Sequence, residues 1–184
     1  MVRDSDAARQ VDMTGISTPR TDERSTVRSL TDRPSVMVVD SSQLPGGEPD
    51  RCQSFVFAVG TRRHRVWGVG VLSPQSLSIN LLGGDLPHIG AVAIGIPRPS
   101  LARSGRRSAT TSVIALVGHK EDDLAKSLAN ELARRIGIPT VVVAGVHLRR
   151  ARSSDIAAIL RNSESAMEAI AAHVASARRR TRRR

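Results

Sequence analysis

Residues 112–147 read SVIALVGHKEDDLAKSLANELARRIGIPTVVVAGVH, and this stretch decides the fold class. Residues 112–117 and 140–146 are apolar runs of strand length. Between them, aliphatic residues at a spacing of four predict a helix from about Lys120 to Ile136, ended by a glycine and a proline. The stripe consists of Leu124, Leu128, Leu132 and Ile136. The order strand, helix, strand predicts a β-α-β unit. If its strands are parallel, their carboxyl ends lie at one edge of the sheet, where open α/β sheets bind ligands.

Upstream of this unit the chain predicts further strands. Residues 54–59 and 65–72 resemble a hairpin, and 76–82 alternate as in a half-buried strand. In 91–96, larger aliphatic residues alternate with alanine and glycine, so this strand should be covered on both faces, one of them closely, and Pro97 and Pro99 should end it. The predicted fold class is therefore α/β (α+β), a mixed sheet of about six strands with flanking helices.

The ends of the chain differ from this pattern. Residues 1–50 are rich in polar residues and glycine and are expected to be a disordered leader, with one apolar patch at 36–39. The domain should cover 51–176 and end with a helix over 155–175 that breaks at Asn162-Ser163. Residues 177–184 should form a disordered arginine-rich tail.

Composition excludes several classes of protein. The chain has three aromatic residues, which disfavours binding of single-stranded nucleic acid by base stacking. One cysteine cannot form an internal disulfide or a cysteine-only metal site. No apolar run is long enough for a membrane span, and the N-terminal segment lacks the apolar core of a signal peptide. A cytoplasmic protein is therefore expected. The net charge of +11 includes six arginines among the last seven residues, and such a tail needs no specific nucleic-acid partner.

Three of the five histidines each lie just after the end of a predicted strand. His119 and His147 follow the two strands of the β-α-β unit, and His88 joins them if strand 76–82 runs the same way. Three imidazoles at one edge suit a metal, a ligand phosphate or proton transfer. Each histidine taken alone can equally serve as a loop anchor.

The loop between strands 76–82 and 91–96 is the most unusual segment. Paired glycines permit positive φ and close approach of a ligand, and a proline stiffens the way to the histidine. The loop has neither a Walker nor a dinucleotide-binding pattern, and an elaborate β-turn is the alternative. Its candidate binding residues are Gly83, Gly84, Pro87, His88, Ile89 and Gly90.

The start of the first predicted helix adds a weaker signal. Helix N-termini bind anions, and Lys120 supports that role, but three acidic residues follow it. No arrangement of Ser, Cys, His and Asp predicts a catalytic triad. Binding is thus a better prediction than catalysis.

Taken together, GGDLPHIGAV, GHKEDDLAKSLANELARRIG and VVVAGVH resemble the D subunit of gallate and related hydroxyaryl decarboxylases, a family also described as prenylated-flavin chaperones with a proteasome-assembly-chaperone-like domain. The resemblance covers about residues 54–175. It implies a homodimeric accessory protein that holds prenylated FMN and supports its supply to a UbiD-type decarboxylase. The site residues would be those of the glycine loop with His119, Lys120 and His147.

Three alternatives stay open. One is a metal-dependent enzyme using His88, His119 and His147, and another is an assembly scaffold without a cofactor. The third is a nucleic-acid binder, which depends on the arginine tail alone.

Overall fold

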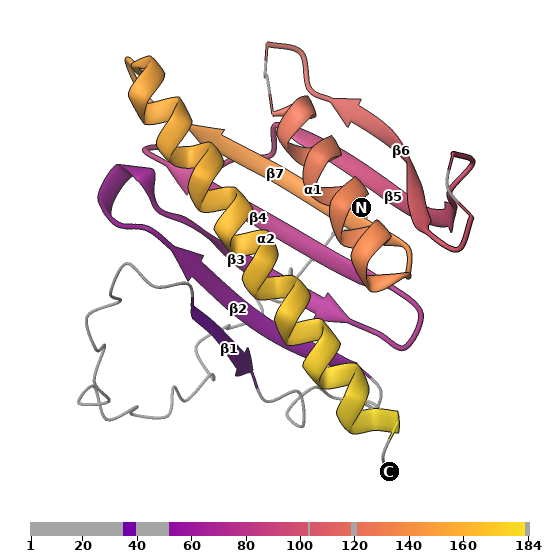
Figure 1. Ribbon diagram of the computed structural model, residues 1–184. Helices are drawn as coiled ribbons and strands as arrows, with labels where there is room; N and C mark the ends of the chain where they lie inside the picture. Colours follow the sequence, from indigo (N-terminus) through magenta and orange to yellow (C-terminus); the bar gives the residue numbers. More distant parts are fainter. Residues whose placement is uncertain (1–34, 40–51, 103, 119–120, 183–184) are drawn as a thin grey trace, which may run out of the picture.

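A mixed sheet and two helices form two layers, with both helices on the same face of the sheet (Figure 1). The computed structural model describes residues 35–39, 52–102, 104–118 and 121–182. The strands are β1 (Ser35–Val39), β2 (Gln53–Val59), β3 (Val66–Leu72), β4 (Leu77–Gly84), β5 (Ala91–Pro99), β6 (Arg107–Ala115) and β7 (Thr140–His147). The helices are α1 (Asp122–Ile136) and α2 (Ser153–Arg182), with one 3₁₀ turn at Arg62–His64. The α+β class and the mixed sheet with flanking helices are confirmed.

The seven strands lie in the order β1-β2-β3-β4-β7-β5-β6. Strands β2 and β3 form the predicted hairpin, and β4 pairs with β7 in parallel. Strand β5 lies between β7 and β6 and is antiparallel to both, so β6 and β7 run the same way without being neighbours. The carboxyl ends of β4, β6 and β7 therefore share one edge of the sheet, as the sequence predicted.

The core lies between the sheet and the helices. It is mainly aliphatic, with Phe55 and Phe57 from β2 as its large aromatic members. Strand β5 places its small residues toward α1, where a Cβ added to Gly95 would lie 2.2 Å from the carbonyl oxygen of Ala129. Helix and strand thus approach closely because no side chain separates them.

The opposite face of the sheet differs from the expectation. Strand β5 is covered on one face only, since Ile94 and Ile96 on its other face are 39% and 50% exposed. The prediction of two covered faces is wrong because both helices pack on the same face of the sheet, which leaves the other face of β5 without a covering helix. The strand also continues through Pro97 to Pro99, and β6 begins at Arg107, earlier than predicted.

The predicted leader contributes a strand. The apolar patch at 36–39 belongs to β1, which pairs antiparallel with β2 over five residue pairs. The rest of residues 1–50 falls outside the described residues. The sheet thus has one strand more than the six that the sequence analysis placed in the domain.

Helix α2 is longer and more regular than predicted. It runs without interruption through Asn162-Ser163, where a break was expected. Ser163 is buried within the helix, and the Asn162 side chain donates to the His64 carbonyl, a contact that fits a continuous helix. The helix then enters the predicted tail, where Arg178 donates to the Ile136 carbonyl at the end of α1.

Candidate functional site

The loop after β4 is bound by its backbone to the end of β7. The amides of Asp85 and Leu86 donate to the His147 carbonyl at 2.6 and 3.3 Å, and the Gly90 amide donates to the Ala144 carbonyl at 2.9 Å. Gly84 has a φ of +78°, which favours glycine, and a Cβ there would lie 2.2 Å from the His147 carbonyl oxygen. These contacts fix the path of the loop.

Two more glycines allow side-by-side packing at this edge. A Cβ on Gly145 of β7 would lie 1.6 Å from the His88 carbonyl oxygen, and one on Gly90 would lie 2.5 Å from the Glu121 carboxylate. The glycines were predicted to admit a ligand to the backbone. In the structure they admit neighbouring protein segments, which holds His88 over the end of β7.

Two of the three predicted histidines meet. The ring centroids of His88 and His147 are 6.0 Å apart, with the rings nearly perpendicular at 74°. Nδ1 of His88 lies 3.1 Å from the Leu86 carbonyl, to which it must donate because a carbonyl oxygen only accepts. Nε2 lies 3.4 Å from Glu121 Oε1 at the start of α1. The loop, β7 and α1 thus supply one side chain each, and we call His88, Glu121 and His147 the histidine cluster.

A polar clamp holds the neighbouring connections. Asp85 accepts from the Arg149 amide at 2.9 Å and from the Arg63 guanidinium at 3.2 Å, while Arg63 also donates to the Arg149 carbonyl. Nearby, His64 lies 2.7 Å from Asp155 at the start of α2. A backbone hydrogen bond from Arg152, and then the contact with His64, lower the pKa of Asp155. The connections after β2, β4 and β7 therefore form one preorganised surface.

Large exposed apolar side chains lie on the two connections next to the histidine cluster. Leu86 and Ile89 in the loop, and Leu116 and Val117 after β6, are all exposed. The Leu116 amide donates to the Gly90 carbonyl at 2.9 Å, so these two connections lie side by side. Of the four, the sequence analysis named only Ile89. It also missed Glu121 as a site residue, because an acid at a helix start is ordinary helix stabilisation.

The remaining predicted residues divide into two groups. Gly83, Gly84, Pro87, His88, Ile89, Gly90 and His147 all lie at this edge. His119 and Lys120 lie outside the described residues, so their predicted contribution is untested. Within the described part of the chain, no three His, Cys, Asp or Glu side chains are grouped as a metal site would require.

The fold and this edge define a class: an α+β domain with a preorganised surface where imidazoles, one carboxylate and exposed apolar side chains converge. Comparison with known families makes the class specific. Residues 60–175 match the family model described as "Prenylated flavin chaperone LpdD-like domain". The chain belongs to this family, as the resemblance indicated, and the family agrees with prenylated FMN as the expected cofactor. No curated protein matches the chain.

Two coarser properties also follow. A domain of a prenylated-flavin chaperone family suggests a non-catalytic protein that serves a partner enzyme. Among the described residues, no helix has the length and apolar character needed to cross a bilayer.

Proposed function

We propose that this chain is a cytoplasmic binding protein that holds prenylated FMN at the histidine cluster and supports its supply to a UbiD-type, gallate-like decarboxylase. The observation that carries the proposal is the pairing of His88 and His147, whose ring centroids are 6.0 Å apart, on connections that also carry exposed apolar side chains, in a family domain named for a prenylated flavin. The decarboxylation chemistry belongs to the cofactor in its enzyme. This chain needs only to bind and release it.

The residues at this edge suit both the prenylated ring system and the phosphate of such a cofactor. Leu86, Ile89, Leu116 and Val117 offer apolar surface to a prenylated ring system, whose burial is favourable. The exposed Arg149 and Arg150 lie on the connection after β7 and can neutralise a phosphate. Gly83, Gly84, Pro87 and Gly90 shape the loop, and we also assign His119 and Lys120 to the site from the sequence.

The first test is the substitution His88→Ala in protein co-expressed with a flavin prenyltransferase. Loss of one hydrogen bond to a charged group costs about 1.5–3 kcal/mol, so flavin affinity should fall about ten- to a hundredfold. The melting temperature should stay nearly unchanged, because backbone hydrogen bonds from Asp85, Leu86 and Gly90 to β7 hold the loop and do not involve the His88 side chain. Flavin absorbance titration and thermal melts on the same samples measure both.

His64→Ala is the matched control. It also removes a histidine at this edge of the sheet, but one that contacts Asp155 and does not belong to the histidine cluster. It should leave flavin affinity within about twofold of wild type. Unchanged affinity in His88→Ala together with a lower melting temperature would show a loop anchor and defeat the assignment. A protein that stays colourless in cells making prenylated FMN would favour the cofactor-free scaffold.

We also propose that the chain forms a homodimer through the sheet face that the helices leave bare. Large apolar residues on β3, β5 and β6 are exposed there: Trp67, Val69, Val71, Ile94, Ile96 and Ile114. The outward positions of these strands and of β4 and β7 carry no charged residue except Arg98 at the rim, which bonds Thr110. An uncharged apolar face can meet an identical copy of itself without like-charge repulsion.

Val69→Asp should convert a dimer to a monomer, because it places a charge among the exposed apolar residues of this face, at the middle of β3. Ser127→Asp on the exposed side of α1 is the charge-matched control and should leave the dimer intact. Light scattering after size exclusion gives the mass. A monomeric wild type that dimerises only after residues 1–34 are removed would identify that segment, and not a second copy, as the occupant of the face.

A further inference from the structure

A second polar site lies at the sheet edge opposite the histidine cluster. A pocket of about 370 Å³ opens where β6 begins, α1 ends and the last turns of α2 pass by. It is lined by Arg107, Ile136, Gly137, Ala175, Arg178 and Arg179. Three of its six lining residues are therefore arginines, and they come from two elements far apart in the sequence.

The end of α1 explains how two of these arginines are held. Arg107 donates to the carbonyls of Arg134 and Arg135 at 3.3 Å, and Arg178 donates to the Ile136 carbonyl at 3.2 Å. These bonds satisfy the carbonyls that a helix leaves at its C-terminus. Each guanidinium carries five N–H donors, so bonds made by one nitrogen leave others for a ligand. The pocket is thus preorganised by contacts that a ligand need not break.

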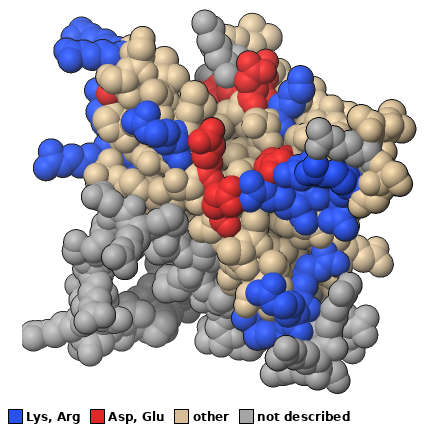
Figure 2. Space-filling model, viewed as in Figure 1, with Lys and Arg blue, Asp and Glu red and all other residues tan. Residues whose placement is uncertain are grey.

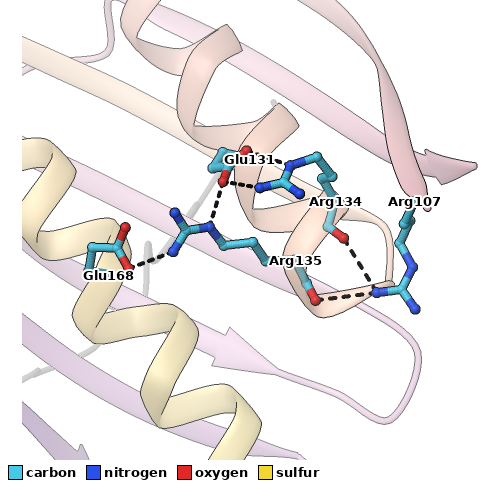
Figure 3. Close-up of polar contacts among 5 residues, drawn as sticks. All are labelled: Arg107, Glu131, Arg134, Arg135 and Glu168. Atoms are coloured by element: carbon cyan, nitrogen blue, oxygen red, sulfur yellow. Dashed lines mark hydrogen bonds and ion pairs between the residues drawn. The ribbon is translucent and has the colours of Figure 1, made fainter. Parts of the chain in front are cut away.

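The neighbouring arginines of α1 differ from those of the pocket because they form ion pairs with glutamates. Arg134 and Arg135 bind Glu131, and Arg135 also binds Glu168 on α2 (Figure 3). Arg107 and Arg178 instead donate to backbone carbonyls, which carry only partial charge. Figure 2 shows basic side chains gathered over the C-terminal ends of both helices, with acidic ones alongside. Basic side chains therefore gather around the pocket on this face of the molecule (Figure 2).

We propose that this pocket docks an acidic segment of a partner protein, with one or two carboxylates held by Arg107, Arg178 and Arg179. Guanidinium groups bind carboxylates in a bidentate fork, and Ile136 and Ala175 provide apolar contact for the stems of Asp or Glu side chains. A nucleic acid is less well matched, because the pocket has no aromatic lining residue and Glu168 lies beside Arg135. The site lies away from the histidine cluster, so it does not depend on the flavin proposal.

The test uses the full chain and a fluorescein-labelled hexaglutamate peptide at physiological salt, followed by fluorescence anisotropy. Arg179→Gln should weaken peptide binding about tenfold, as expected for one charge-assisted contact. Arg178→Gln should weaken it similarly, and its melting temperature identifies any loss that comes from uncapping α1. Neither substitution should alter flavin affinity.

Two variants with the same loss of charge serve as controls. Arg161→Gln removes an exposed arginine from the other half of α2, and Arg183→Gln removes one from the same C-terminal run of the sequence. Each should change peptide affinity less than twofold. Equal losses in all four variants would show diffuse charge attraction and overturn the proposal. Tighter binding of a twelve-residue oligo(dT) with the same sensitivity to Arg179→Gln would overturn it in favour of nucleic acid, and binding of orthophosphate without peptide would do so in favour of a small anion.

Discussion

At the scale of single residues, glycines shape the site because they remove side chains from crowded backbone contacts. Gly145 shows this most directly, since the His88 carbonyl oxygen occupies the place of its missing Cβ. Both partners in that contact are backbone, so neither can rotate away as a flexible side chain would. The position of His88, in the loop, therefore depends on a residue of strand β7.

Gly145→Ala should consequently displace the loop and the histidine together. Overpacking against backbone costs about 1–3 kcal/mol, so we expect stability to fall by at least that amount and flavin affinity to fall with it. Gly105→Ala is the control, because a Cβ there meets nothing within 4 Å and only the positive φ of +74° is strained. Urea unfolding and flavin titration compare the two. A Gly145→Ala protein with wild-type stability and affinity would mean that the loop can move aside freely.

The histidines were predictable at this scale, and the glycine function was not. His88 and His147 could be placed together because strand ends follow from hydrophobic runs and from the rule that β-α-β strands end at one edge. Which atoms crowd Gly84, Gly90 and Gly145 depends on segments that are distant in the sequence. Local conformational preference indicates only that glycine is tolerated there.

At the scale of elements, an ion-pair network joins the two helices. Glu131 accepts from Arg134 and Arg135 within α1, and Arg135 reaches Glu168 on α2 (Figure 3). The hydrogen bond from Arg134, followed by that from Arg135, lowers the pKa of Glu131 from 4.5 to about 2. A carboxyl group whose pKa is lowered on folding stabilises the folded state above its unfolded pKa and loses that effect as the pH falls toward its folded pKa.

Glu131→Gln should therefore reduce stability at pH 7 and have progressively less effect as the pH falls from about 4.5 to 2. Because the network is partly exposed, we expect a loss of roughly 0.5–1 kcal/mol at pH 7. Denaturant unfolding at several pH values measures the difference from wild type. Glu164→Gln, an exposed carboxylate on α2 with the same change of charge, is the control. A difference that does not vary with pH would mean that packing, and not the charge, stabilises the contact.

The elements were predicted well where the pattern is local and less well where contacts across the fold decide. The aliphatic stripe of α1 and the apolar run of β7 were sufficient to place both elements. The absence of a break in α2 depends on the contact between Asn162 and the His64 carbonyl, which no local pattern contains. The coverage of β5 likewise depends on which side of the sheet the helices take.

At the scale of the whole molecule, the sheet and its bare face raise the question of where the folded domain begins. The sequence favours a domain of residues 51–176, because the polar composition of the leader gives little apolar surface to offset the cost of ordering the chain. The structure adds β1 at the margin of the sheet, paired with β2. Without β1, strand β2 would become an open edge with unpaired backbone groups.

Two N-terminal deletions separate these possibilities. A variant that begins at Ser35 keeps β1 and should melt within a few degrees of the full chain. A variant that begins at Cys52 loses five paired residues and leaves the backbone of β2 open along one side. Each net backbone hydrogen bond contributes about 1 kcal/mol, but fixing the backbone of each β1 residue costs a similar amount, so the balance should be a modest loss of about 1–2 kcal/mol and a melting temperature lower by roughly 5 °C. Both variants should be measured at concentrations where the oligomeric state is known, because dissociation of a dimer also lowers the melting temperature. Equal melting temperatures for the two would show that β1 contributes nothing to stability and that the boundary near residue 51 is the correct one.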